Sequence, residues 1–105
     1  MKKDKPVLLS KTAISKKIKT LSNWQLIQRR RALKKDYLMK NFVAAVELIY
    51  RIMKIAEAAD HHPDLHLTSY RKLKIVLSTH SAGGLTNKDF ILASKIDRLP
   101  KTLKL

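Results

Sequence analysis

The longest helical pattern of hydrophobic residues in the chain covers residues 42–60. Asn41 can cap its start, no glycine or proline interrupts it, and Pro63 disfavours helical backbone at the residue before it. Polar side chains form only a narrow stripe, at Glu47, Arg51 and Lys54. The pattern therefore predicts a long helix that is apolar on both sides of this stripe.

The apolar surface of this predicted helix divides into two flanks. The first flank consists of Phe42, Ala45, Val46, Ile49, Met53 and Ala56. The second flank consists of Leu48, Ile52, Ile55 and Ala59. Because a single sheet covers one flank, we expect the second to contact another subunit, in a homodimer or homotetramer of closed symmetry. Replacing Leu48 or Ile52 by glutamate is then expected to dissociate the subunits.

Four shorter stretches have the pattern of strands. Residues 72–79 alternate most clearly, with hydrophobic side chains at every second position, and residues 65–68 precede them. Residues 24–28 and 32–39 form a further predicted hairpin, although neither glycine nor Asn-Gly marks its turn at residues 29–31. The side chains expected to face inward in this hairpin are Trp24, Leu26, Ile27, Leu33, Tyr37 and Leu38.

Two more helices complete the predicted fold. One covers residues 10–21, with Ser10 as its cap and a narrow apolar stripe backed by lysines. The other starts at Thr86, where Thr86-x-x-Asp89 has the form of a capping box. The order helix, strand, strand, helix, strand, strand, helix predicts an α+β fold, a four-stranded antiparallel sheet with helices packed on one face in a two-layer sandwich.

The length of 105 residues predicts a single domain over residues 1–105, with a basic segment at residues 1–23. No hydrophobic run is long enough for a membrane span or a signal peptide, so a cytoplasmic location and no membrane contact are expected. Cysteine is absent, which excludes disulfides and thiolate metal sites and leaves histidine and carboxylate as the available site chemistry.

The net charge of +15 is concentrated near the N-terminus. Residues 1–35 contain 12 Lys and Arg against one acid, a charge of +11, while residues 36–105 contain 11 against 7, a charge of +4. Such a surface attracts polyanions, although it also simply keeps a small protein soluble. We expect weak, salt-dependent and sequence-independent binding to nucleic acid through residues 29–31 and the lysines of the first helix.

All four histidines lie between Glu57 and Asp89. His61 and His62 are adjacent and would diverge by about 100° on a helix, but Pro63 requires irregular backbone that can re-aim them. Glu57 precedes His61 by four residues, so it is expected to reach that imidazole. A metal site from these side chains is the rival interpretation, but their spacing matches no zinc template, and no metal is expected.

The motif Glu-x3-His-His-Pro-x6-Tyr-x9-His-x8-Asp, from Glu57 to Asp89, resembles the signature of the pterin-4a-carbinolamine dehydratases. The words LSTH, GGLTNKDFILASKID, WQL and NFVAAVELI also resemble that family, so the resemblance covers residues 24–97. His66 is outside the fixed positions and is expected to be a surface or edge residue. Tyr70 and Trp24 are expected to be packing residues.

The resemblance implies the same α+β fold and a dehydration of 4a-hydroxytetrahydropterin to quinonoid dihydropterin and water, in recycling of the tetrahydropterin, with no cofactor. It implies acid and base roles for His61 and His80, in an order left open, and an orienting role for His62. Glu57 would support His61. Asp89 would bind the pterin or steady His80.

The alternative is a non-catalytic binding or dimerisation module of the same fold, in contact with a transcription factor or nucleic acid. Some members of the resembled family act as dimerisation partners of a homeodomain transcription factor. The intact set of histidines favours the enzyme, because a binding module has no need of it.

Overall fold

The computed structural model describes residues 6–105, so the first five residues of the basic segment lie outside it. Every predicted helix and strand is present, with ends that differ by a few residues, and a short 3-10 turn, η1, follows the last strand. In chain order the elements are α1 (Lys11–Ile18), β1 (Gln25–Ile27), β2 (Ala32–Leu38), α2 (Phe42–Ala59), β3 (Asp64–Thr68), β4 (Lys72–Leu77), η1 (His80–Ala82) and α3 (Asn87–Arg98).

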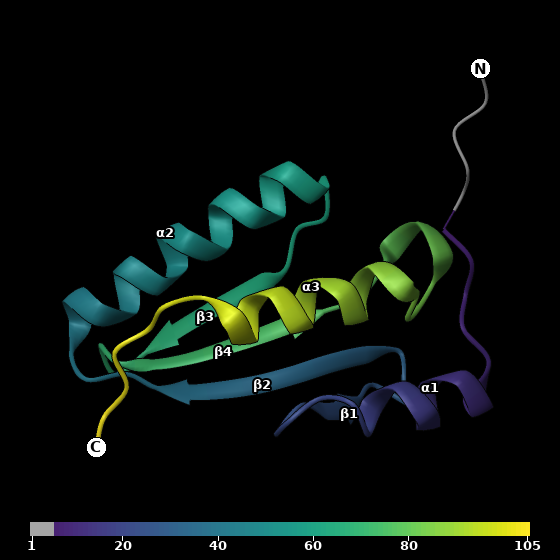
Figure 1. Cartoon of the computed structure of the whole chain (residues 1–105), viewed down its shortest axis with the longest axis horizontal. Helices are drawn as coiled ribbons and strands as arrows, with labels where there is room; N and C mark the ends of the chain where they lie inside the picture. Colours follow the sequence, from purple (N-terminus) through teal and green to yellow (C-terminus); the bar gives the residue numbers. More distant parts are fainter. Residues whose placement is uncertain (1–5) are drawn as a thin grey trace.

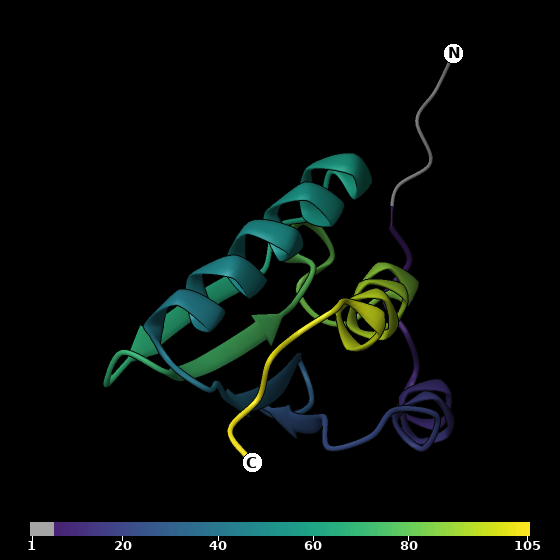
Figure 2. The same ribbon diagram turned by 60° about the vertical axis from the view of Figure 1, so that its left-hand side comes forward.

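The four strands form one antiparallel sheet in the order β1-β2-β4-β3. Leu33 pairs with Leu77 and Tyr37 with Leu73 across the two central strands. Helices α2 and α3 lie across one face of this sheet, and α1 lies near β1, at the side of α3 (Figures 1 and 2). This arrangement confirms the predicted α+β fold.

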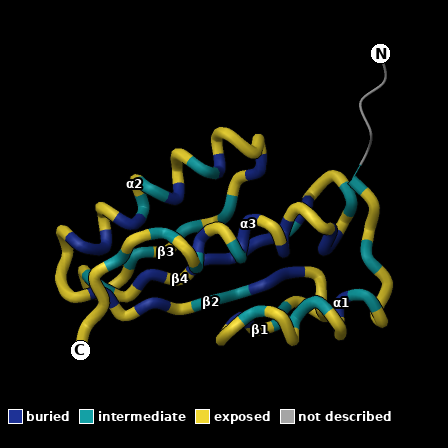
Figure 3. The backbone as a smooth tube through the Cα atoms, viewed as in Figure 1, coloured by how far each residue is buried: buried dark blue, intermediate teal, exposed yellow. Residues whose placement is uncertain are grey.

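Alternation along the strands places one set of side chains under the helices and the other on the open face. Leu73, Ile75 and Leu77 of β4 are fully or almost fully buried, as Figure 3 shows for the centre of the sheet. The prediction that Leu38 faces inward is wrong, because Leu38 follows the inward Tyr37 directly and so faces the other way, with 42% of its surface exposed. Met39 is fully buried instead.

The three α-helices begin at the residues that the sequence predicts. Ser10 accepts a hydrogen bond from the backbone N–H of Ala13 at 3.1 Å, and Asn41 accepts one from Ala44 at 2.9 Å. Thr86 caps α3 in a complete capping box with Asp89. These caps fix where each helix starts and, at α3, fix the position of a carboxylate that belongs to the candidate site.

The two flanks of α2 are not separated as the sequence pattern suggested. Leu48 and Ile52, expected to contact another subunit, are fully buried in the core, because α2 packs against α3 as well as against the sheet. The exposed hydrophobic side chains of α2 are Phe42, Val43, Val46, Tyr50 and Met53. Within residues 6–105, no helix is long and apolar enough to span a bilayer.

The turn between β1 and β2 has an unusual backbone. Gln28, Arg29 and Arg30 have φ angles of 52°, 57° and 66°, in the left-handed region. Residues other than glycine, asparagine and aspartate adopt this region at a cost of roughly 1–2 kcal/mol each. The turn therefore presents three consecutive arginines at residues 29–31 on a strained loop.

Candidate functional site

The end of α2 determines where the adjacent histidines point. Asp60 adopts the left-handed conformation, with φ 50°, and the backbone N–H of His61 donates to the carbonyl oxygen of Ala56 at 3.1 Å. The backbone N–H of Asp60 also donates to the carbonyl oxygen of Glu57, at 3.2 Å. Together the two bonds form a Schellman motif, which ends the helix before the histidines. His61 and His62 thus leave the helical spacing from which the contact between Glu57 and His61 was predicted.

His61 forms a buried pair with Asp89, the third residue of α3. The imidazole Nε2 lies 2.7 Å from Asp89 Oδ1, and the side chains are 9% and 0% exposed. The other oxygen of Asp89 accepts hydrogen bonds from the Thr79 hydroxyl at 2.8 Å and from the Thr86 backbone N–H at 2.9 Å. Asp89 is therefore the centre of a polar network that joins the end of α2, the end of β4 and the start of α3.

The contact with Asp89 determines which nitrogen of the His61 imidazole is free to exchange a proton with a ligand. Because a carboxylate only accepts hydrogen bonds, we assign the proton of this contact to Nε2 of His61. In the neutral imidazole the lone pair is then at Nδ1, the atom that can take up or release a proton. The Thr79 hydroxyl donates its proton to Asp89. Its oxygen lies 2.9 Å from the Thr86 hydroxyl and can therefore accept a hydrogen bond from it.

Glu57 and His62 form a second, exposed pair. The Glu57 carboxylate contacts His62 Nε2, and the side chains are 64% and 61% exposed. The prediction that Glu57 contacts His61 is wrong, because the left-handed backbone of Asp60 turns His61 inward to Asp89. Glu57 supports the neighbouring imidazole instead.

His80 is the first residue of η1, directly after Thr79, and its side chain is exposed. Asp89 was expected to bind the pterin or steady His80, but its hydrogen bonds go to His61, Thr79 and Thr86. Through Thr79, the network holds the segment that bears His80. Thr79 is the residue that sequence reasoning missed, since its only signal was its place in the LSTH word.

A cavity of about 190 Å³ lies between the end of α2 and α3, beside His61. Its walls are apolar, and two lysines stand beside them; its lining residues are Ala59, His61, Lys88, Ile91, Leu92 and Lys95. His62 and His80 do not line it. Nothing in the sequence pattern indicated Lys88 and Lys95 as site residues, because lysines at helical spacing are typical of any solvated helix face.

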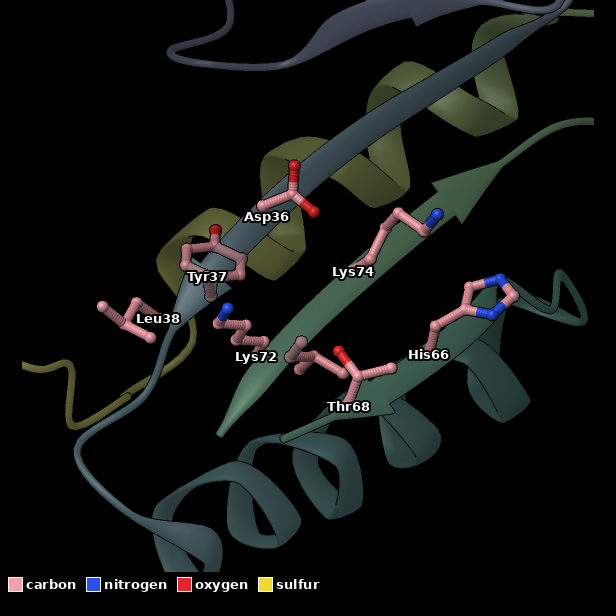
Figure 4. A pocket seen from close by; sticks show the side chains of 8 residues that line it. Asp36, Tyr37, Leu38, His66, Thr68, Lys72 and Lys74 are labelled. Atoms are coloured by element: carbon pink, nitrogen blue, oxygen red, sulfur yellow. The ribbon is translucent and has the colours of Figure 1, made fainter. Parts of the chain in front are cut away.

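A wider depression of about 550 Å³ lies on the open face of the sheet, over β2, β4 and β3 (Figure 4). It includes His66 and none of the candidate site residues. His66 is exposed on the outer strand β3, which confirms it as a surface residue. In residues 6–105, no three His, Asp or Glu side chains gather as metal ligands would.

The two aromatic residues predicted to pack behave differently. Trp24 is buried in the core, as expected. Tyr70 is 57% exposed, so the expectation that it packs is wrong. Tyr70 occupies the tight β3–β4 turn with a φ of 56°, and its ring lies 5.4 Å from the Arg71 guanidinium.

A second polar cluster surrounds Asp97, at the other end of α3. Its carboxylate accepts hydrogen bonds from Trp24 Nε1 at 3.0 Å, Lys35 Nζ at 2.8 Å and Tyr37 OH at 2.5 Å. Burial raises the pKa of Asp97, but the bonds from Lys35, Tyr37 and Trp24 outweigh burial and hold that pKa below its usual value. Burial, followed by the bond to Asp97 and its charge, raises the pKa of Tyr37.

The fold and the buried His61–Asp89 pair define a small α+β protein with histidine side chains at the ends of two core elements. The family description "Pterin 4 alpha carbinolamine dehydratase" matches residues 7–99, and the chain belongs to this family.

Relatives agree with this assignment. A protein of Nostoc punctiforme, provisionally named as a pterin-4-alpha-carbinolamine dehydratase, is 40% identical over 92 residues, which cover 88% of this chain and 96% of that protein. The Arabidopsis thaliana protein named pterin-4-alpha-carbinolamine dehydratase 2, mitochondrial, is 39% identical over 84 residues, 78% of this chain and 45% of that protein.

Two solved structures have a similar fold. The transcriptional coactivator/pterin dehydratase from Brucella melitensis has a TM-score of 0.80 and 28% identity, over 85% of this chain and 94% of that one. A pterin dehydratase-like protein identified as a RuBisCO assembly factor in the alpha-carboxysome has a TM-score of 0.60 and 14% identity, over 72% of this chain and 87% of that one. The second likeness concerns the fold alone.

Proposed function

We propose that this protein is a pterin-4a-carbinolamine dehydratase, which converts 4a-hydroxytetrahydropterin to quinonoid dihydropterin and water. The observation that carries the proposal is the buried His61 imidazole, fixed at Nε2 by Asp89. Asp89 closes the capping box of α3 with one oxygen and holds the His61 imidazole in a fixed orientation with the other. Membership of the family supports the same reaction.

The reaction is an elimination that needs only proton transfers. A proton leaves a ring nitrogen of the pterin, the C4a–O bond breaks, and the hydroxyl leaves with a second proton as water. An imidazole suits either transfer because its ordinary pKa is near neutrality. We assign one transfer to His61, at Nδ1, where Asp89 stabilises the protonated ring, and the other to His80.

The remaining candidates act on orientation. His62, held by the Glu57 carboxylate, is exposed beside the buried pair and is proposed to orient the pterin. Asp89 is a positioning residue, since it contacts His61 and Thr79 and is fully buried.

The test is the rate at which freshly generated 4a-hydroxytetrahydropterin loses water in the presence of the purified protein. We expect an acceleration over the buffer rate that is proportional to protein concentration and is abolished by heat denaturation. A rate equal to that of buffer, with a folded protein, would favour the non-catalytic module.

Contact with nucleic acid is a second proposed property, supported by the strained arginine turn. The exposed lysines of α1 and its C-cap (Lys11, Lys16 and Lys19) and the arginines at residues 29–31 lie in a stretch, residues 6–35, that contains no acidic side chain. We expect weak binding to DNA or RNA that falls steeply with salt and shows no sequence preference. Tight, salt-insensitive and sequence-selective binding in an anisotropy titration would contradict this.

We also propose a homo-oligomer, with α2 as the contact. Val43, Val46, Tyr50 and Met53 are exposed at spacings of 3, 4 and 3 residues, the repeat of helices that pair along one seam. Val46→Glu should reduce the mass measured by light scattering, with Lys74→Glu as the control. An unmutated protein of 12.1 kDa in solution would contradict the proposal. A cytoplasmic location stays a prediction.

A further inference from the structure

The cavity beside His61 combines an apolar wall with two positive charges. Ala59, Ile91 and Leu92 supply the apolar surface, and Lys88 and Lys95 lie seven residues apart on α3, two helical turns that place them on the same side. No acidic side chain lines the cavity. A ligand that fills it would therefore meet an imidazole, an apolar wall and two ammonium groups.

The side chains of Lys88 and Lys95 have no ion-pair or hydrogen-bond partner among residues 6–105, in contrast to three other lysines of the chain. Lys34 pairs with Asp36, Lys35 pairs with Asp97, and Lys101 donates to three carbonyl oxygens at the end of α3. Lys88 and Lys95 are in none of the ion pairs or side-chain hydrogen bonds found there.

The acids nearest to them in sequence, Asp89 beside Lys88 and Asp97 two residues after Lys95, bond to other groups. Asp97 accepts hydrogen bonds from Trp24, Lys35 and Tyr37. Asp89 follows Lys88 directly, but its side chain is fully buried and its oxygens face His61, Thr79 and Thr86. The capping box that serves the histidine thus also removes the carboxylate from the outer surface of α3. The positive charge beside the cavity is left for an external anion.

The cavity adjoins a second, larger space. A groove of about 560 Å³ between α3 and α1 shares Ile91 and Lys95 with the cavity. It adds Lys17 and Arg98 as cations and further polar side chains, and its lining is Lys17, Thr20, Asn87, Phe90, Ile91, Ser94, Lys95 and Arg98. A ligand substituent that extends from the cavity past Ile91 would enter this groove, where Lys17 and Arg98 could donate to an anionic group.

We infer that the substrate of this protein is a pterin with an anionic side chain, a phosphate ester or a carboxylate, bound by Lys88 and Lys95 beside His61. The inference rests on the proposed dehydratase function and adds the class of substrate to it. The lysines are substrate-binding residues that attract the anion and leave proton transfer to the histidines. A pterin with a neutral side chain lacks this contact.

The kinetic test compares three carbinolamines, one with a neutral side chain, one with a phosphate ester and one with a glutamate carboxylate. We expect kcat/KM to be higher for the anionic substrates, with KM as the parameter that changes. In Lys88→Gln/Lys95→Gln the preference for the anionic over the neutral substrate should fall roughly tenfold, as two partly exposed ion pairs would give. The better of the two anionic substrates identifies the anion.

Matched variants separate a local contact from the general charge of the protein. Lys74→Gln/Lys72→Gln removes two exposed lysines of β4 and should leave the preference as it is. Lys95→Arg should retain the preference, and Lys95→Glu should reverse it. An unmutated protein that shows no preference, or a control pair that loses it equally, would overturn the inference.

An equilibrium experiment separates failure of this inference from failure of the proposed function. Binding of stable oxidised pterins with neutral, phosphate or carboxylate side chains is followed by their fluorescence at two salt concentrations. If dehydration is absent but the anionic pterins bind more tightly, in a salt-dependent and Lys88/Lys95-dependent way, the site stands and the reaction is wrong. Equal affinity for neutral and anionic pterins contradicts the site whatever the kinetics show.

Discussion

Helix α3 has an aspartate near each end, and each aspartate accepts three hydrogen bonds, from different partners. Asp89 accepts hydrogen bonds from His61, Thr79 and the Thr86 backbone. Asp97, eight residues and about 12 Å further along the helix, accepts them from Trp24, Lys35 and Tyr37. Each carboxylate accepts three hydrogen bonds and ties α3 to distant parts of the chain, through two of the donors at Asp89 and all three at Asp97.

The partners decide what each cluster can do. Imidazole is the side chain that changes its charge near neutral pH, so the Asp89 cluster can exchange protons with a ligand. No imidazole lies among the donors that Asp97 has within residues 6–105, and burial, followed by the bond to Asp97, raises the pKa of Tyr37 above its ordinary value. On the proposed mechanism, a carboxylate with three donors supports chemistry at one end of α3 and stability at the other.

The largest expected effect is at the Asp89 end. His61→Ala and His80→Ala should each lower kcat by about 10²- to 10⁴-fold, because acid and base groups act on protons that move in the transition state. Pterin affinity should largely persist, since it depends on shape and contacts made in the ground state. Measurements of kcat and of pterin binding check this, with His66→Ala as the control.

Because His61 is buried, His61→Gln serves as a second variant that keeps a side-chain N–H for Asp89 but has no titratable group. Its kcat should be as low as that of His61→Ala. Near-full activity of folded His61→Gln and His80→Ala would show these assignments to be wrong and would direct attention to Glu57 and Asp89.

The next effect is at the Asp97 end. Asp97→Asn removes a charge and presents an amide N–H₂ to three donors, so it should lower the free energy of unfolding by about 1–3 kcal/mol without lowering kcat of the folded protein. Denaturant titration checks this, with Asp36→Asn, an exposed ion pair, as the control at below about 0.5 kcal/mol. A loss of kcat with unchanged stability would reverse the roles of the two clusters.

Acid should weaken the Asp97 cluster in a defined direction. The folded pKa of Asp97 is lower than its unfolded value, so its contribution to stability is complete above the unfolded pKa of about 3.9 and is lost as pH falls through the folded pKa. The stability difference between the unmutated protein and Asp97→Asn should therefore be smaller at about pH 3 than at about pH 6. A difference that is the same at both pH values would argue against the charged network.

The smallest effect is expected at the exposed Glu57–His62 pair. Glu57→Gln should change the free energy of unfolding by less than about 0.5 kcal/mol, because both side chains are solvated. If Glu57 helps His62 to orient the pterin, affinity should fall by less than about fivefold. A large loss of stability would mean that the exposed pair is structural.

The sequence predicted the elements of this fold because its local signals were strong and agreed with one another. The caps Ser10, Asn41 and Thr86 and the alternation at Leu73, Ile75 and Leu77 are properties of neighbouring residues. Leu48 and Ile52 were assigned to the wrong surface because burial depends on α3, which covers α2 from the side. No pattern within residues 42–60 contains that information.

The candidate site was likewise predicted from the sequence only where local signals determine it. Thr86-x-x-Asp89 predicted the capping box, but the partner of Asp89 depends on Asp60, whose left-handed backbone turns His61 inward. Sequence spacing assumes continuous helix and therefore assigned Glu57 to the wrong histidine. Lys88 and Lys95 can be recognised as candidate ligand-binding residues only from the cavity that the end of α2 forms with α3.

The most direct measurement is the dependence of kcat on pH for the unmutated protein and for His61→Gln. We expect a bell-shaped profile around neutrality for the unmutated protein, since an acid and a base titrate in opposite senses. In His61→Gln, one limb of the bell should disappear and the remaining activity should be low. A profile with the same two limbs and the same height in the variant would contradict proton transfer by His61.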